Sequence, residues 1–485
     1  LADKYLNAAS QYIAMYEKLI GPYPYKKFAL VENFYETGFG MPSFTLLGSK
    51  VTRLPFIINS SYPHEILHNW WGNSVFVDYN SGNWSEGLTA YLSDYLIMEQ
   101  QEKGMEYRQT TLQKYADYVS TGKDFPLTEF RMRYSAPTES IGYGKSLLFF
   151  HMLRQKLGDK DFTAGLQDFY LKNKFEFASF TDIKKSFEDA SKRDLSIDFK
   201  QWVAQAGAPE IRLTDVKATT DKEGYLITGY IEQVQKGEAY HIQIPVAVTM
   251  ENTERAFQTV LIMDKKKMKF SISAPSRPLR IDIDPEFDIF RRLDRAETPP
   301  AISQVLGARE MLIILPSSAS HSLLLSYREF AKALSNLNAD KTKIMLDKEI
   351  KKLPSGQAVI ILGWENIFLK KMTSLLSKYD VLIDKSKDHS VVFSARDPKD
   401  IEMALLFIAS DAIEALPGLG RKLPHYHKYS YLTFKGKEPE NITKGRWPVY
   451  DSPMTAYLPD KNGAITKIEM GKLAARNPLI AIPSP

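Results

Sequence analysis

The sequence predicts a multidomain α+β protein in which a mainly helical part, a small antiparallel β-sandwich and an α/β part follow one another. Three observations predict this class. The length of 485 residues corresponds to about three domains of ordinary size. Apolar residues recur at helical spacing in the first part, and short β-branched runs then replace them. Beyond a Pro299-Pro300 linker, strands and helices alternate. We therefore expect domains at 1–206, 207–297 and 301–485.

The first domain is predicted to open with a helix over residues 4–20, because its apolar positions repeat with helical spacing. Gly21-Pro22 ends that helix, since proline cannot continue it. A strand is expected at 28–31. Further periodic patterns predict helices at 86–99, 106–120 and 147–157.

The two later domains are predicted from their strand patterns. Strands of the sandwich are expected at 211–219, 225–232, 241–249, 256–263, 268–273 and 279–283. The α/β domain is expected to contain strands at 311–315, 358–362 and 390–394 and helices at 320–334, 367–378 and 398–414. Residues 440–485, rich in Pro, Gly and Lys, are expected to be loosely structured. His425 and His427 alternate on an expected strand and are interpreted as surface residues, because no third metal ligand lies nearby.

Composition excludes several classes of function. A net charge of +5, with lysines scattered or in short runs, gives no argument for nucleic acid as a partner. No apolar run reaches transmembrane length. The chain has no cysteine, which excludes disulfides and thiol chemistry and favours a periplasmic, cell-envelope or secreted setting over the cytoplasm. Because the sequence begins at Leu1, we expect a processed or truncated form.

The segment His64-Glu65-Ile66-Leu67-His68 carries a pattern that is typical of zinc sites. On a helix, residues four apart lie on one face, so His64 and His68 can present two imidazoles to one point. Catalytic zinc takes three protein ligands and keeps one position open for water. Glu86, at the start of the next predicted helix, is the expected third ligand. Glu65 lies beside the first ligand and can act as general base, so we predict a catalytic centre with one Zn²⁺ per chain.

These residues resemble the alanyl-aminopeptidase family of zinc metallopeptidases, peptidase family M1, which are gluzincins with a thermolysin-like, mainly helical catalytic domain. The family pattern H-E-x-x-H-x-W-x-G-N and the later Glu-Gly are matched at His64, Glu65, His68, Trp70, Gly72, Asn73, Glu86 and Gly87. The sequence departs from the family at Ser85, which replaces an asparagine, and in having one residue fewer between His68 and Glu86. The β-domain that normally precedes the catalytic domain is missing from this sequence.

The resemblance assigns roles to two further segments. Members of the family carry Gly-Ala-Met-Glu-Asn on an edge strand that pairs with the peptide substrate. Here that stretch reads Gly38-Phe39-Gly40-Met41-Pro42, so we expect a modified substrate-binding strand in which Pro42 replaces the glutamate that holds the substrate's free amine. The resemblance also implies that Tyr143, in Tyr143-Gly144-Lys145, donates a hydrogen bond to the oxyanion. His151, in an apolar helix, is expected to be a core residue.

The resemblance implies aminopeptidase action on peptides, and two alternatives stay open. One is an endopeptidase, or a peptidase without a free-amine requirement. Pro42 favours it because proline offers neither a side-chain acceptor nor a backbone N–H, and Glu36 and Glu139 are the nearest replacements by sequence. The other is a binding or assembly protein on a retired peptidase fold, but Glu65 and Tyr143, which such a protein would be free to lose, are both present. The sequence gives no oligomeric state.

Overall fold

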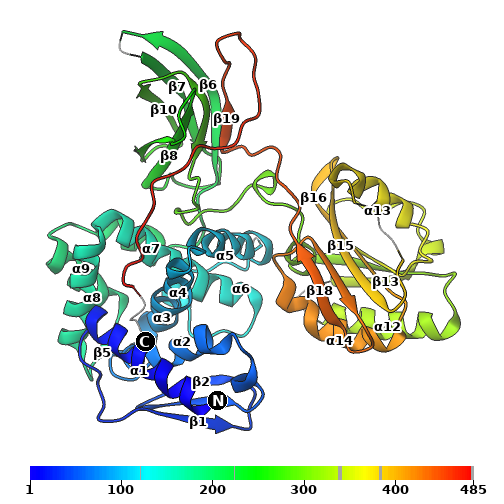
Figure 1. Ribbon diagram of the computed structural model, residues 1–485, viewed down its shortest axis with the longest axis horizontal. Helices are drawn as coiled ribbons and strands as arrows, with labels where there is room; N and C mark the ends of the chain where they lie inside the picture. Colours follow the sequence, from blue (N-terminus) through cyan, green and yellow to red (C-terminus); the bar gives the residue numbers. More distant parts are fainter. Residues whose placement is uncertain (121, 223, 337–340, 382–384, 482–485) are drawn as a thin grey trace.

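The computed structural model describes residues 1–485 apart from 121, 223, 337–340, 382–384 and 482–485. Three bodies are visible in Figure 1: a mainly helical one in blue and cyan, one built from green strands, and one in yellow and orange in which helices flank a sheet. The N-terminus lies on the helical body, and the red C-terminal segment returns to it. The three predicted domain ranges stay predictions.

The helical body begins with α1 Ala2–Leu19, which confirms the helix predicted at 4–20 and buries one apolar face, including Tyr12 and Tyr16. Two π-helical turns, η4 Tyr91–Tyr95 and η6 Ser140–Lys145, lie within longer helical stretches. The remaining α-helices of this body are α2 Ser61–Leu67, α3 Trp84–Ala90, α4 Leu96–Gln100, α5 Gly104–Tyr118, α6 Ala136–Glu139, α7 Ser146–Leu157, α8 Asp159–Asn173, α9 Phe180–Ser191 and α10 Ser196–Trp202. Two short strands, β4 Phe76–Val77 and β5 Phe177–Ala178, pair in parallel.

A small sheet of order β1-β3-β2 packs against α2. It consists of β1 Ala29–Asn33, β2 Gly38–Met41 and β3 Phe44–Gly48, with β2 antiparallel to β3. Pro42 and Ser43 form the turn between β2 and β3, and the positive φ of Ser43 (69°) after a proline suits a type II turn. Strand β2 is therefore an edge strand, whose outer backbone groups can pair with an extended peptide.

The second body contains two antiparallel sheets, of order β10-β7-β6 and β19-β11-β8-β9. The strands are β6 Ile211–Asp221, β7 Gly224–Gln233, β8 Ile242–Met250, β9 Phe257–Met263, β10 Lys267–Ala274, β11 Pro278–Ile283 and β19 Thr455–Tyr457. The strands expected between 211 and 283 are thus present. Burial alternates along β10, so that one side chain in two joins the core, as a half-buried strand requires.

The third body is a sheet of order β13-β12-β14-β16-β15-β17-β18, parallel from β13 to β16 and antiparallel beyond. Its strands are β12 Glu310–Leu315, β13 Lys341–Leu346, β14 Ala358–Leu362, β15 His389–Asp397, β16 Asp400–Ser410, β17 Tyr431–Lys435 and β18 Glu440–Gly445. Its helices are α11 Ile302–Leu306, α12 His321–Ser335, α13 Leu369–Leu376 and α14 Leu416–Lys422. Separate apolar clusters cover the two faces of the sheet.

The structure corrects the helix predicted at 398–414, because residues 400–410 form strand β16 at the centre of the sheet. The run from Ala404 to Ala409 is buried throughout. A strand covered on both faces is apolar without alternation, so periodicity alone does not distinguish it from a buried helix. His425 and His427 are also corrected: they lie in and just after the 3₁₀ turn Leu423–Tyr426, not on a strand.

The C-terminal residues are more ordered than their composition predicts. Strand β18 extends the α/β sheet, and β19 pairs with β11 in the second body. Beyond it, Arg476 forms an ion pair with Asp288, and Gln100 of α4 donates a hydrogen bond of 2.7 Å to the carbonyl of Ile480. The prediction of loose structure over 440–485 is therefore wrong for β18 and β19, which pair with other strands, whereas most of the other described residues beyond 445 have no regular secondary structure.

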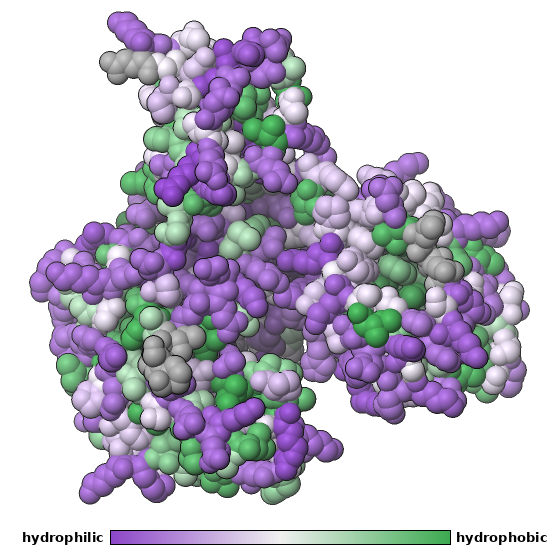
Figure 2. All heavy atoms as spheres, in the orientation of Figure 1, coloured by the Kyte–Doolittle hydropathy of each residue, from purple (hydrophilic) through white to green (hydrophobic). Residues whose placement is uncertain are grey.

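Figure 2 shows that the visible face of all three bodies is mostly hydrophilic, with apolar residues scattered over it. Scattered apolar residues of this kind are usual on folded proteins. Among the described helices, none has the length and apolar character needed to cross a lipid bilayer.

Candidate metal centre and catalytic cleft

The two histidines of the motif lie one turn apart on α2 and face the same cavity. His64 lies within α2, and His68 follows its last residue with a helical backbone conformation. Their ring centres are 4.9 Å apart. The four-residue spacing therefore places both imidazoles on one face of the helix, as the sequence predicts.

Glu86 reaches the same point from the first turn of α3. Asn83 caps this helix, its side chain accepting a hydrogen bond of 3.2 Å from the backbone N–H of Ser85. Buried Trp84 fixes the helix start, because its indole N–H donates to the carbonyl of Ala178 at 2.7 Å. Glu86 Oε2 then lies 3.5 Å from His64 Nε2 and 3.6 Å from His68 Nε2.

The donor set fits a zinc ion. One ligand atom from each of His64, His68 and Glu86 lies within 4.8 Å of the other two. His64 Nδ1 is 2.9 Å from Asp94 Oδ2, and His68 Nδ1 is 2.9 Å from the carbonyl oxygen of Trp71. Each Nδ1 therefore has a hydrogen-bond acceptor, which leaves each Nε2 lone pair directed toward Glu86. This is the arrangement in which metal-binding histidines are usually held.

Asp94 is a residue of the candidate centre that the sequence reasoning missed. It lies in the π-helical turn η4, eight residues after Glu86, which is close to two helical turns. A carboxylate two turns after the predicted third ligand is the signal that could have found it. The π-turn changes the local register, and the structure shows the result in the contact with His64.

The charges of the site perturb its carboxylates in opposite directions. Burial opposes ionisation of Glu86, but His68 and His64 outweigh it and hold the pKa of this carboxylate well below its usual range. Burial raises the pKa of Glu65, and the two imidazoles only partly counter it. A carboxyl group with a raised pKa is the better proton acceptor, which suits Glu65 to work as a base.

His64, His68 and Glu86 line a cavity of about 580 Å³, together with residues of strand β2 and turn η6. Gly38, Phe39, Gly40 and Met41 all contribute to its wall, whereas Pro42 lies in the turn that follows. The two glycines allow close packing, because a Cβ atom at Gly38 would be 2.6 Å from the Glu65 carboxylate and one at Gly40 would be 2.6 Å from His68 Cβ.

Tyr143 reaches the cavity from the π-helical turn η6. Its ring centre is 6.4 Å from that of His64, with the two rings nearly parallel, and the ring of Phe130 packs edge-on against it at 6.0 Å. Burial and the nearby Glu86 raise the pKa of Tyr143, so its hydroxyl keeps its proton. Lys145 instead points into the core, where its ammonium donates to the carbonyl of Gln205 at 2.6 Å and burial lowers its pKa to about 8.

Of the two carboxylates considered as replacement amine anchors, Glu36 lies outside the cavity wall. Its Oε2 accepts hydrogen bonds from the backbone N–H groups of Lys50 and Val51, at 2.8 and 3.3 Å. Glu139 does line the cavity, where it contacts two cationic side chains, Lys114 and Arg133.

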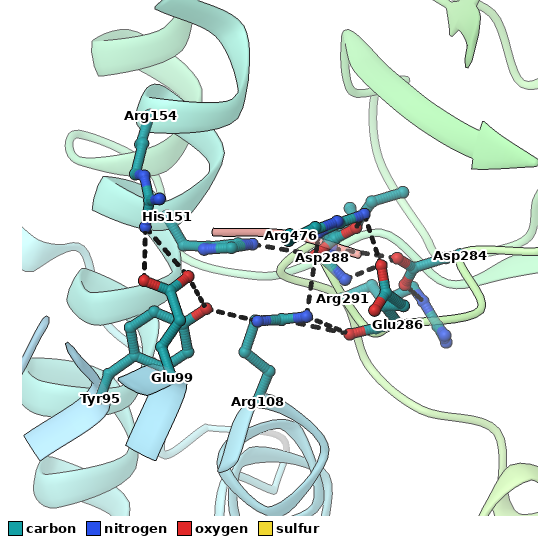
Figure 3. A network of polar contacts seen from close by, with 11 residues as sticks. Tyr95, Glu99, Arg108, His151, Arg154, Asp284, Glu286, Asp288, Arg291 and Arg476 are labelled. Carbon is teal, nitrogen blue, oxygen red and sulfur yellow. Dashed lines mark hydrogen bonds and ion pairs between the residues drawn. The ribbon is translucent and has the colours of Figure 1, made fainter. Parts of the chain in front are cut away.

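A network of charged side chains supports the helix that carries Asp94 (Figure 3). Glu99 of α4 accepts hydrogen bonds from Arg154 at 2.8 Å and from the hydroxyl of Tyr95 at 3.0 Å. Tyr95 directly follows Asp94 and also contacts Arg108 of α5. Because Arg108 lies in α5 and Arg154 in α7, these contacts hold η4 and α4 against both of those helices.

The same network extends to the C-terminal residues. Asp288 accepts hydrogen bonds from His151 at 2.9 Å and from Arg476 at 2.7 Å, and it lies 3.1 Å from Arg108 (Figure 3). His151 is fully buried, which bears out its interpretation as a core residue, and burial lowers its pKa to about 4. Arg476, near the C-terminus, thus contributes to the packing behind the candidate metal site.

Comparison with known proteins relates part of this chain to a described family. The model of the peptidase family M1 domain matches residues 5–202, which contain every residue that lines the cavity. Residues 5–202 form a peptidase family M1 domain. Alanine/arginine aminopeptidase of Saccharomyces cerevisiae is 24% identical over 226 residues, which cover 43% of this chain and 25% of that protein. Glutamyl aminopeptidase of Homo sapiens is 24% identical over 332 residues, which cover 65% of this chain and 33% of that protein.

The chain spans about a quarter to a third of the length of these relatives. Among solved structures, Legionella pneumophila aminopeptidase A in complex with aspartic acid matches 78% of this chain and 42% of that chain. The TM-score is 0.45 at 16% identity, which is too low to support conclusions about this protein. The M1 domain assignment thus applies to the helical body, and the activity of the whole chain is a matter for proposal.

Proposed function

We propose that this protein is a zinc-dependent peptidase, and that it acts as an aminopeptidase. One observation carries the proposal: His64, His68 and Glu86 bring three ligand atoms within 4.8 Å of one another, in a cavity that Glu65 and Tyr143 also line. When bound, zinc would polarise the peptide carbonyl and lower the pKa of a water molecule. The comparisons support the peptidase class, because the relatives above are named aminopeptidases.

The residues of the chain would divide the remaining work. Glu65 takes a proton from the attacking water and passes it to the leaving amine. Tyr143, protonated because burial raises its pKa, donates a hydrogen bond where negative charge develops on the carbonyl oxygen. Asp94 holds the imidazole of His64 in place, and edge strand β2 pairs with the extended substrate.

A peptidase without a free-amine requirement is the second candidate, and the position of Pro42 favours it. An aminopeptidase needs an acceptor for the substrate's ammonium group. Pro42 lies in the β2–β3 turn and has no side-chain acceptor, and Glu36 lies outside the cavity wall. The third alternative, a retired peptidase fold, is disfavoured because Glu65 and Tyr143 both line the cavity.

Metal analysis combined with peptide hydrolysis tests the proposal. The purified protein should hold about one zinc per chain, and His68→Ala should lose most of it. The zinc-loaded protein should hydrolyse peptides, and Glu65→Gln should retain zinc while losing nearly all turnover. Full zinc occupancy in His68→Ala would refute the ligand assignment. Comparing kcat/KM for one peptide with a free and with an acetylated N-terminus separates the first two candidates.

A further inference from the structure

Two cationic side chains stand beside a single carboxylate on the wall of the catalytic cavity. Lys114 Nζ lies 2.9 Å from Glu139 Oε1, and an Arg133 guanidinium nitrogen lies 3.4 Å from Glu139 Oε2. All three residues line the cavity that holds the metal-binding residues. Two positive charges face one negative charge, so this part of the wall has an excess of one positive charge. We call Lys114, Arg133 and Glu139 the cationic corner.

The cationic corner lies close to the reacting groups. The Arg133 guanidinium carbon is 5.8 Å from the centre of the Tyr143 ring, and that ring is stacked at 6.4 Å from the ring of His64. A substrate group at the corner would therefore be near the bond that is cleaved, within the reach of an adjoining residue of a peptide. The positive charge of the corner can therefore affect which peptides bind.

Arg133 remains available to a ligand. Its side chain is 58% exposed, against 28% for Lys114 and 32% for Glu139. Among the described residues, the hydrogen bond to Glu139 is the one that Arg133 donates to another side chain. A guanidinium group has five N–H donors in a planar fork, which matches a carboxylate with two parallel hydrogen bonds.

The carboxylates of the cavity wall are already engaged. Those that the described residues supply are Glu65, Glu86, Asp94 and Glu139. Glu86 and Asp94 contact the imidazoles, Glu65 is the base, and Glu139 is neutralised by Lys114 and Arg133. An ammonium group placed at Glu139 would meet two cations, so Glu139 is a poor anchor for a free amine. A carboxylate at the same place would meet an excess of positive charge.

We propose that the cationic corner is a carboxylate-binding subsite, in which Arg133 selects peptides with a negative charge next to the cleaved bond. That charge comes from an acidic side chain or from the free C-terminus of a short peptide. The proposal rests on the proposed peptidase function, and it names the class of substrate: acidic or very short peptides.

Binding to a zinc-loaded protein that cannot turn over tests the subsite. The Glu65→Gln protein is titrated calorimetrically with Ala-Ala-Ala and its C-terminal amide, and with the amides of Ala-Glu-Ala and Ala-Gln-Ala. At least one carboxylate-bearing peptide should bind about tenfold more tightly than its neutral partner, which is the effect of one charge-assisted contact. A difference confined to the first pair identifies the C-terminus as the source, and one confined to the second pair identifies the side chain.

Three further substitutions in the Glu65→Gln background test whether Arg133 is responsible for the preference for carboxylate-bearing peptides. Arg133→Gln should reduce the difference in affinity between the carboxylate-bearing peptide and its neutral partner to less than twofold. Arg131→Gln is the matched control, because Arg131 lies in the same exposed segment but donates to the carbonyls of Thr128 and Phe130 and lies outside the cavity wall; it should keep the difference. Glu139→Gln should increase it, since the variant removes the negative charge of the corner, and a purely structural role of Arg133 does not predict that increase.

The outcomes separate the two proposals. Equal affinities within both peptide pairs would overturn the carboxylate subsite, as would an equal loss of preference in Arg131→Gln and Arg133→Gln. If the carboxylate preference is present but the zinc-loaded wild-type protein hydrolyses none of the four peptides, the peptidase proposal fails for them while the subsite stands. Hydrolysis of all four with equal kcat/KM and equal affinity would support the peptidase and refute the subsite.

Discussion

Gly38 offers a direct test of how strand β2 positions Glu65, the proposed catalytic base. In Gly38→Ala the new Cβ atom would be 2.6 Å from Glu65 Oε1, whereas ordinary contact begins near 3.4 Å. The carboxylate must therefore retreat by about 0.8 Å, and it can do so because it is the free end of a flexible side chain. A misplacement of about 1 Å can cost on the order of 10²-fold in rate. We expect kcat to fall by about that factor with little change in thermal stability.

The neighbouring glycine should behave differently. In Gly40→Ala the Cβ atom would be 2.6 Å from His68 Cβ and 3.0 Å from the backbone oxygen of Glu65, neither of which moves without helix α2. That variant should lose about 1–3 kcal/mol of stability, the usual cost of overpacking. Gly420→Ala is the matched control, because its nearest neighbours are 3.6 Å away.

The assay measures kcat on one peptide, zinc content and the thermal midpoint for the three variants. A wild-type kcat in Gly38→Ala would refute the steric reasoning, because the added Cβ atom would then fit beside Glu65 without displacing its carboxylate. A loss of zinc in the same variant would place the damage at the ligands rather than at Glu65.

Three more predictions concern groups around the site. Asp94→Asn weakens the support of His64 and should reduce zinc affinity about 10- to 100-fold in competition with a chelator; unchanged affinity would contradict the role of Asp94. Tyr143→Phe should lower kcat on the order of 10²–10³-fold with little change in KM, and an unchanged kcat would show that the Tyr143 hydroxyl takes no part in catalysis. Burial lowers the pKa of His151 to about 4 from the usual 6.5. Between these two pH values, the imidazole therefore binds a proton in the unfolded chain but not in the folded one. The free energy of unfolding should therefore fall by about 3 kcal/mol as pH decreases from 6.5 to 4, and denaturant unfolding of His151→Gln should show a shallower slope over that range.

Local patterns predicted the parts of the fold that depend on local physics. The helix that begins the chain and the strands between 211 and 283 follow from the spacing of apolar residues, because each element buries one face. Strand β16 was missed for the opposite reason: both of its faces are covered, and its sequence carries no periodicity. The order of the C-terminal residues was missed because Arg476 and β19 are held by partners that are distant in sequence.

The sequence by itself determined the chemistry of the candidate centre. The four-residue spacing of His64 and His68 puts both rings on one helix face, and Glu65 must then lie beside them. Three features depend on the tertiary structure and cannot be read from the spacing of residues in the sequence. Glu86 faces the two rings, Asp94 reaches His64 from a π-helical turn, and Pro42 lies in a turn. The tertiary structure also decided that Glu139 is paired with two cations. These are contacts between separate elements, and they depend on how helices and strands pack, which the local pattern of one segment does not encode.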